Sequence, residues 1–199
     1  SSLSSYFEKA GIPKEKISTG FHYVDSDYYQ KQQSVNSHSP LKVIMMGALQ
    51  RNYSMLAEVV KQCPDVHWII CKGRKNVDDL FPKTPNVELK GFLAEDELRH
   101  QMDIADVSLN VMEDTVGSNV ITTSMAMGLA MIVSDVGSIR DYSNDENALF
   151  CPNNVEQFVR AIKKLQNNLH LVSHMKKASL ENSKRLQIDN INRWFFKLK

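Results

Sequence analysis

From residue 41 onward, short apolar runs alternate with stretches in which apolar residues recur every three or four positions. The runs predict strands, and because their residues are nearly all apolar, these strands are expected to be buried on both faces of a parallel sheet. They lie at 43–46, 66–71, 86–89, 107–111, 131–134 and 148–151. The helical stretches between them lie at 53–63, 95–102 and 118–127. This alternation predicts an α/β fold with a doubly wound parallel sheet and helices on both faces.

The two ends of the chain differ in pattern from this centre. The first forty residues predict a helix at 3–10 and a strand at 16–21, followed by a polar loop at 30–40. After residue 154 the spacing is helical throughout. We expect three parts: a linker segment with its first helix and strand at 1–40, a core at 41–153, and C-terminal helices at 154–199. Because the sequence opens within a helix and lacks a starting Met, it is expected to be a piece of a longer protein.

The composition is that of an ordinary soluble domain and excludes several classes. The chain has 199 residues, of which 42% are hydrophobic and 24% charged. No apolar run is long enough to span a bilayer, and no secretory signal is visible. The three cysteines are too widely spaced for a zinc motif and too few for a disulfide framework. We therefore expect a cytoplasmic protein.

Charge is spread unevenly along the chain although its formal net value is only +1. Residues 154–199 carry ten basic and three acidic residues, which leaves a net −6 for the rest. The near-neutral total argues against a nucleic-acid partner. The basic end allows two interpretations: a solvated helix face, or a surface for peripheral contact with a membrane or an anionic partner.

The loops that follow the strands are the places to look for a binding site, because ligands of parallel α/β sheets bind at the carboxyl ends of strands. Gly47 and Arg51 follow the first core strand, where a glycine lets the backbone approach a ligand and a guanidinium can pair with phosphate oxygens. Lys72 follows the second strand in a loop with three cations. Each of these features is also common in ordinary solvated loops.

The segment 113–128 is the richest in candidate chemistry. It turns at Gly117 and enters a helix through Ser118 or Asn119, both of which are good N-cap residues. The free N–H groups and the dipole of a helix start favour a diphosphate. Thr123 lies one turn later on the same face. A plain capped core helix explains the same residues equally well.

The order of several motifs resembles the C-terminal, nucleotide-sugar-binding half of retaining glycosyltransferases of the GT-B fold, family 4, also called glycosyl transferases group 1. Similar stretches are Gly11–Ile17 with Tyr23-Val24-Asp25, Gly47 with Arg51-Asn52, Asn86–Leu98, Ala105-Asp106-Val107, and Met125–Gly137. The resemblance implies a Rossmann-like domain with a helical C-terminal tail. It also implies a UDP- or GDP-sugar as substrate, with no separate cofactor.

This sequence departs from the family's pattern at two positions. The family commonly has two glutamates with seven residues between them, and both positions hold threonine here, Thr115 and Thr123. The resemblance then points to Glu113 or Asp114 near the transferred sugar, and to the amides of Gly117, Ser118, Asn119 and Val120 around the diphosphate. A threonine offers the ribose one hydroxyl and no charge.

The same resemblance implies a mechanism that uses no metal. Arg51 and the helix start would stabilise the charge that develops on the leaving diphosphate. The nucleotide base would lie near Phe92 and Leu93. Asp25-Ser26-Asp27 has the letters of a metal-binding motif but is interpreted as a turn. The glycan or lipid-linked acceptor, as in cell-surface polysaccharide synthesis, would be held by a missing N-terminal domain, so the isolated chain should be inactive.

Two other hypotheses remain open at this stage. In the first, the chain is a degenerate, non-catalytic module that keeps the fold but no longer binds ligands tightly. The two threonines are the best argument for this hypothesis. In the second, the chain is part of another enzyme with the same two-domain fold, such as a nucleotide-sugar epimerase.

Overall fold

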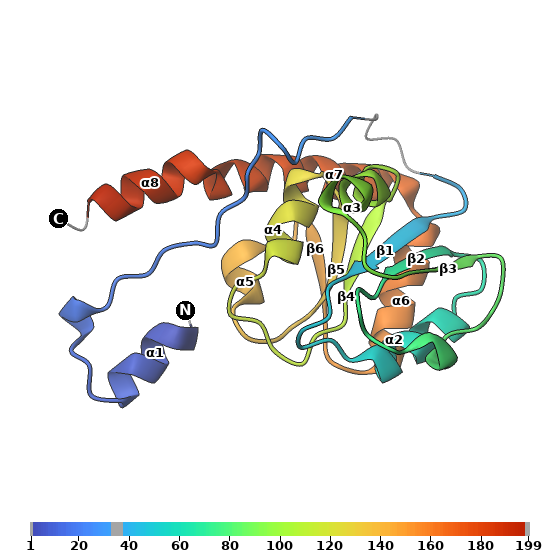
Figure 1. The fold of residues 1–199 in the computed structure, drawn as a ribbon, viewed down its shortest axis with the longest axis horizontal. Coiled ribbons are helices and arrows are strands. Elements are labelled where there is room, and N and C mark those ends of the chain that lie inside the picture. The colour runs from blue at the N-terminus through green and yellow to red at the C-terminus, as the bar shows by residue number, and fades with distance from the viewer. Residues whose placement is uncertain (1, 33–37, 198–199) are drawn as a thin grey trace.

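A single six-stranded parallel sheet forms the centre of the molecule (Figure 1). The computed structural model describes residues 2–32 and 38–197. The strands are β1 (Lys42–Met46), β2 (His67–Cys71), β3 (Val87–Lys90), β4 (Val107–Asn110), β5 (Ala130–Ser134) and β6 (Ala148–Cys151), and they lie side by side in the order β3-β2-β1-β4-β5-β6. Every pair is parallel. The six predicted strands from residue 41 onward are therefore confirmed, within a residue or two at their ends.

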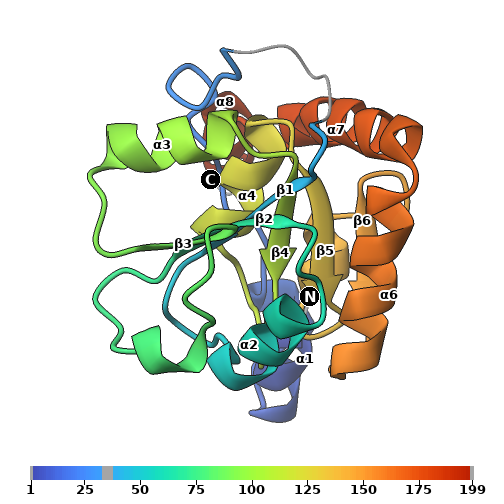
Figure 2. The same ribbon diagram turned by 90° about the vertical axis from the view of Figure 1, so that its right-hand side faces the viewer.

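Helices cover both faces of this sheet (Figure 2). On one side lie α2 (Tyr53–Lys61) and α6 (Val155–Gln166), and on the other α3 (Glu95–Asp103), α4 (Asn119–Ala126) and α5 (Ile139–Tyr142). Successive strand residues face opposite layers: Val43 and Met45 belong to the α2–α6 core, whereas Ile44 and Met46 pack toward α3. The two-faced burial explains why the strands are apolar without alternation.

Helices continue up to residue 196, as the spacing predicts. After α6 come α7 (Leu169–Ser183), a 3-10 turn η3 (Lys184–Leu186) and α8 (Ile188–Phe196). Asn154 and Asn168 cap α6 and α7, because each side-chain oxygen accepts a backbone N–H from the first turn. Figure 1 shows α7 running across one side of the sheet and α8 extending away from the core. Phe195 and Phe196 are exposed on α8.

The linker segment differs from its prediction. The expected helix is present as α1 (Ser2–Lys9), but the expected strand at 16–21 is wrong, since this stretch holds only the 3-10 turn η1 (Lys14–Lys16) and extended chain. It pairs with no strand of the sheet, and Phe21 instead contacts the ring of Tyr142 and the guanidinium of Arg185. Further along the segment, an isolated bridge joins Val24 to Gln187. In the expected loop at 30–40, residues 33–37 lie outside the described residues. The proposed part boundaries at 40 and 153 stay predictions.

Two further properties concern the molecule as a whole. No described helix combines the length and the apolar character that crossing a membrane requires. The three cysteines are buried and unbridged, and burial raises the pKa of Cys71 to about 12 and those of Cys63 and Cys151 to about 11. A thiol in such surroundings keeps its proton and is a poor nucleophile.

Candidate functional site

Two loops at the carboxyl edge of the sheet enclose a cleft of about 440 Å³. One loop joins β1 to α2 and contributes residues 47–51; the other joins β4 to α4 and contributes residues 114–120. Because β1 and β4 are neighbours in the sheet, the residues that follow them meet at one edge. The predicted site residues Gly47, Arg51, Asp114 and 117–120 all line this one cleft.

The backbone of the first loop requires residues that tolerate a left-handed conformation. Gly47 has φ +87° and Gln50 has φ +53°. A Cβ on Gly47 would also lie 3.2 Å from Cγ2 of Val120, across the cleft. The Tyr53 hydroxyl donates to the carbonyl of Gly47 at 2.8 Å, and the side chain of Asn52 caps α2. These contacts hold the loop in place as one wall of the cleft.

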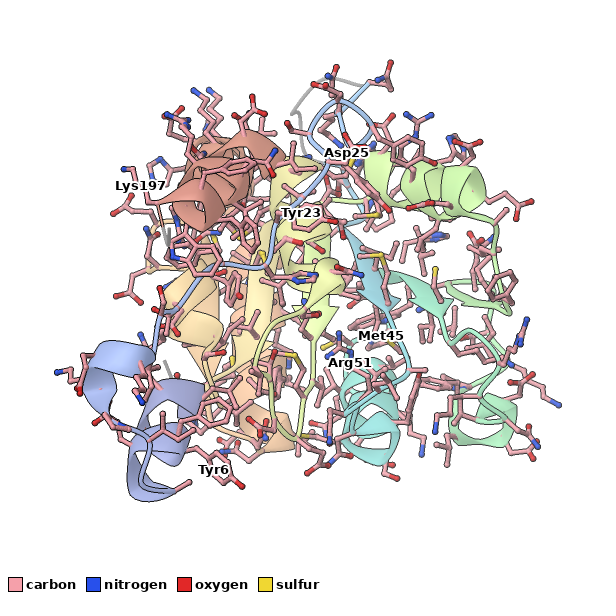
Figure 3. All side chains as sticks on the ribbon, turned by 60° about the vertical axis from the view of Figure 1, so that its left-hand side comes forward. Tyr6, Tyr23, Asp25, Met45, Arg51 and Lys197 are labelled. Carbon is pink, nitrogen blue, oxygen red and sulfur yellow. The ribbon has the colours of Figure 1, made fainter. Side chains whose placement is uncertain are left out.

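Arg51 is anchored by the ends of two neighbouring strands. Its Nε donates to the carbonyl of Met46 at 3.1 Å, and Nη2 lies 3.5 Å from Oδ1 of Asn110. Figure 3 shows it where β1 passes into α2, beside the β4–α4 loop. Burial lowers its pKa, but a guanidinium keeps its charge in proteins. The side chain therefore presents a fixed positive charge to the cleft.

The opposite wall is the start of α4. Ser118 is the N-cap residue and has an extended backbone, but its side chain makes no capping hydrogen bond. Its carbonyl accepts the N–H groups of Ile121 and Thr122. The first N–H groups of a helix have no partner within the helix, and the dipole adds partial positive charge there. Arg51 and this helix start thus give the cleft two sources of positive potential.

The candidate acids lie at the edge of this cleft. Asp114 and Glu113 are both exposed, and Oδ1 of Asp114 accepts the N–H of Thr115 at 2.7 Å. The Glu113 N–H donates to the carbonyl of Gln50 at 3.0 Å, which ties the second loop to the first. Asp114 lines the cleft, and Glu113 lies one residue outside its lining.

The other predicted ligand contacts lie outside the cleft lining. Lys72 pairs with Asp78 at 2.8 Å and donates to the carbonyl of Lys75. Phe92 is 70% exposed with Arg74 stacked 5.1 Å from its ring centre, while Leu93 packs on the core beneath α3. Their loops follow β2 and β3 in register with β1, so they share the carboxyl edge of the sheet.

Thr123 is already engaged within its own helix. Its hydroxyl donates to the carbonyl of Asn119 at 2.6 Å. The hydroxyl hydrogen of Thr123 is therefore already engaged in a hydrogen bond with the backbone. Its oxygen can still accept a hydrogen bond from a ligand. Thr123 stays a predicted contact that reaches a ligand only as an acceptor or after rotation of its side chain.

Sequence reasoning missed three residues that shape the site. Asn110 is completely buried at the end of β4 and positions Arg51. Ser138 donates through its backbone and side chain to the carbonyl of Thr115 and thereby holds the β4–α4 loop. His22 reaches over from the linker segment and contacts Oδ1 of Asn119 through Nε2. Asn110 had a local signal, since a polar residue at the end of an apolar strand needs a partner.

Metal-binding groups are sparse in the part of the chain that the structure describes. No cluster of three or more His, Cys, Asp or Glu side chains there is placed to hold an ion. The Asp25-Ser26-Asp27 stretch forms the expected turn, because Oδ1 of Asp25 accepts the N–H groups of Asp27 and Tyr28 at 3.1 Å each.

The fold defines the class: a parallel Rossmann-like α/β domain with a helical C-terminal end, matching one half of GT-B glycosyltransferases. The chain belongs to the glycosyl transferases group 1 family, whose model matches residues 40–168. No curated protein matches the chain in sequence.

Solved structures agree with this assignment of the fold. HepE of Anabaena, solved with UDP and glucose, superposes with a TM-score of 0.83 at 16% identity over 98% of this chain and 60% of its own. A glycosyltransferase from Rickettsia africae superposes with a TM-score of 0.81 at 14% sequence identity, over 94% of this chain and 57% of its own. The C-terminal domain of LpcC, a group 1 glycosyl transferase of Francisella tularensis, superposes with a TM-score of 0.69 at 15% sequence identity. The match covers 83% of this chain and 99% of that domain. The chain thus spans little more than half of the longer neighbours.

Proposed function

We propose that this chain binds the nucleotide diphosphate sugar donor of a retaining glycosyltransferase. One observation carries the proposal: Arg51 and the start of α4 line the same 440 Å³ cleft at the carboxyl edge of the sheet. The ligand in this proposal is a UDP- or GDP-sugar, and the similarity to HepE, which was solved with UDP and with UDP-glucose, supports the first of these. The pyrophosphate lies between the guanidinium and the helix start.

In this proposal the chain stabilises the leaving group without a metal. When the glycosidic bond of the donor breaks, negative charge builds up on the pyrophosphate, and fixed donors near that charge lower the barrier. Arg51 supplies a charge, and the amides of 118–120 supply hydrogen bonds. Asp114 or Glu113 lies toward the transferred sugar. Because Thr123 carries no charge, the ribose is held less tightly than by a glutamate.

The acceptor in this proposal is defined only by its chemical class. A glycan or lipid-linked acceptor is bound by a part of the longer relatives that this chain does not include, in the synthesis of a cell-surface polysaccharide. The reaction takes place in the cytoplasm or at the inner face of the membrane, where the basic C-terminal helices provide peripheral contact.

Calorimetric titration of the chain with UDP, GDP and their sugars tests the donor site. We expect saturable binding that Arg51→Ala weakens about 10- to 100-fold, the range for losing a charge-assisted hydrogen bond. The matched control is Arg160→Ala on α6, where the arginine is exposed and pairs with Glu156. Equal loss in both variants would show non-specific attraction and contradict the assignment.

The same titration separates the degenerate-module alternative, which the two threonines favour. That hypothesis expects no heat and no thermal shift with any nucleotide, even at low salt and millimolar ligand. Binding that requires Arg51 excludes it.

A further inference from the structure

The linker segment reaches the proposed donor cleft through the imidazole of His22. Nε2 of this histidine contacts Oδ1 of Asn119, the first residue of α4 and part of the cleft lining. The backbone N–H of His22 donates to the Tyr142 hydroxyl at 3.1 Å, which fixes the segment against α5. A residue 97 positions away thus touches the side chain that begins the helix.

This contact decides which end of the Asn119 amide faces the cleft. An amide has an accepting oxygen on one side and a donating NH₂ group on the other. With Oδ1 turned to His22, the NH₂ group of Asn119 is left for the cleft, where an anion would accept from it. With the amide reversed, the cleft would receive the oxygen, which repels an anion.

Protonation of the histidine enforces the favourable orientation. A neutral imidazole donates from one nitrogen and accepts at the other, so Nε2 tolerates either end of the amide. A protonated imidazole donates from both nitrogens, and Nε2 then accepts only the Oδ1 orientation. The added positive charge also lies beside the proposed pyrophosphate, which it attracts.

We propose that His22 is a positioning residue that makes donor binding depend on pH, with the protonated form orienting Asn119 and strengthening the hold on the pyrophosphate. The inference rests on the proposed donor site. It adds to that site a residue from the linker segment and a direction for the pH dependence.

Charged and titratable residues of α5, η3 and the linker segment lie near His22. The Tyr142 hydroxyl of α5 accepts its backbone N–H, and Asp141 directly precedes Tyr142. Tyr23 adjoins it on the same segment, and Arg185 of η3 stacks on neighbouring Phe21. Of these residue types, histidine alone has an ordinary pKa between pH 5 and 8. A pH profile over this range therefore reports on the imidazole.

The test measures the Kd of UDP-glucose, and of GDP-mannose as a second probe, from about pH 5.5 to 8.5, the range in which histidine titrates. Both are pyrophosphate diesters that keep the same charge across this range, so a change in Kd reports on the protein. For the unaltered chain we expect roughly fivefold tighter binding at the low end, as for a unit charge brought near another.

Two substitutions separate orientation from charge. In His22→Gln the side-chain amide can still donate to Oδ1 of Asn119, so we expect the high-pH affinity to be kept and the pH profile to be flat. In His22→Ala both effects disappear, so binding is weaker and flat. The matched control is His170→Gln, at an exposed histidine near the start of α7, which keeps the full profile. Thermal unfolding checks that each variant is folded.

The outcomes distinguish failure of the inference from failure of the proposed function. Binding that responds to Arg51→Ala but has the same pH profile with and without His22 would overturn the inference alone. Absence of binding by either probe at every pH would overturn both.

Discussion

Gly137 shows how closely one residue of the β5–α5 loop approaches the donor cleft. It has φ +56°, and a Cβ at this position would lie 2.0 Å from the carbonyl oxygen of Thr115 and 2.4 Å from Oδ1 of Asp114. Real side-chain carbons do not approach backbone oxygens this closely. The position of Asp114, the candidate acid in the cleft lining, therefore depends on the absence of a side chain at residue 137.

Replacing Gly137 by alanine should lower the free energy of unfolding by more than the left-handed backbone strain alone would. Gly73→Ala is the matched control, because Gly73 has φ +60° and a Cβ there would meet nothing within 4 Å. We expect urea unfolding to show a loss of about 1–2 kcal/mol for Gly73→Ala from left-handed strain. Gly137→Ala should lose about 1–3 kcal/mol more from the clash. Equal losses would show that the β4–α4 loop yields freely.

Residues whose role follows from their own loop could be predicted, and those that act across the fold could not. Gly47, Arg51 and Asn119 each follow a strand or begin a helix, so the rule for parallel sheets points to them. His22 comes from a segment whose path over α4 is set by tertiary contacts such as the Tyr142 hydroxyl. Its local sequence carries no sign of that path.

Among the secondary-structure elements, burial on two faces made the strands easy to predict, and short or unpaired elements were harder. The stretch 16–21 has a strand-like composition, yet it pairs with neither edge strand, β3 or β6. The four-residue helix α5 is too short for a periodic signal, and Ser138 holds it through contacts with the β4–α4 loop. Periodicity cannot reveal such contacts.

A buried ion pair joins α7 to the opposite, amino edge of the sheet. Lys176 on α7 lies 3.0 Å from Oδ1 of Asp106, just before β4, and neither side chain is exposed. The other carboxylate oxygen accepts the N–H of Lys42 at the start of β1 at 3.0 Å. The single carboxylate thus connects a helix to two central strands.

Removing the lysine should be costly because it leaves a buried carboxylate without its buried cation. We expect Lys176→Met to lower the free energy of unfolding by about 3–5 kcal/mol in urea titration. Lys184→Met is the control, since Lys184 pairs with Glu181 on the surface and exposed pairs contribute little. If the two variants unfold at the same urea concentration, the pair contributes no more than a surface contact.

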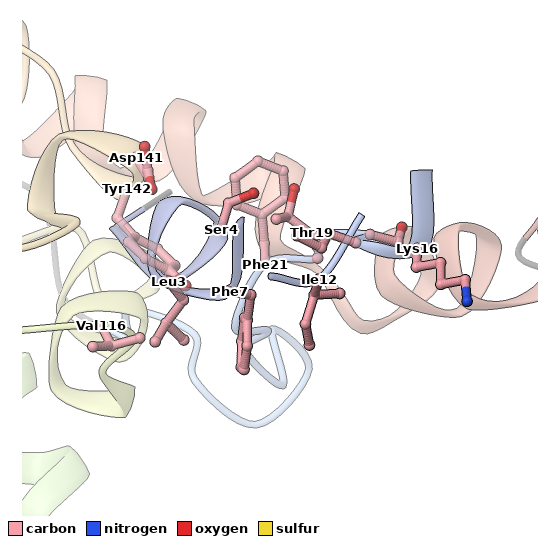
Figure 4. A pocket seen from close by; sticks show the side chains of 13 residues that line it. Leu3, Ser4, Phe7, Ile12, Lys16, Thr19, Phe21, Val116, Asp141 and Tyr142 are labelled. Carbon is pink, nitrogen blue, oxygen red and sulfur yellow. The ribbon is translucent and has the colours of Figure 1, made fainter. Parts of the chain in front are cut away.

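At the scale of the whole molecule, one cavity has no counterpart in the sequence predictions. Its volume is about 560 Å³, and it lies between the linker segment and the β4–α4 and α5 region. Figure 4 shows apolar side chains of the linker around it, among them Leu3, Phe7 and Ile12. These three are partly exposed, at 40–43%. The donor cleft and this cavity both border the β4–α4 loop, because Val116 lines each of them.

The chain spans 57–60% of the Rickettsia and Anabaena glycosyltransferases, so binding and transfer should separate experimentally. In the proposed function, donor binding uses the cleft that this chain lines, whereas transfer also needs an acceptor held against the sugar. Under saturating UDP-glucose, we expect calorimetric binding without release of UDP in a coupled assay. Arg51→Ala serves as the control, since any turnover at this cleft should fall with it. Arg51-dependent turnover by the 199-residue chain would show that its own residues suffice for catalysis.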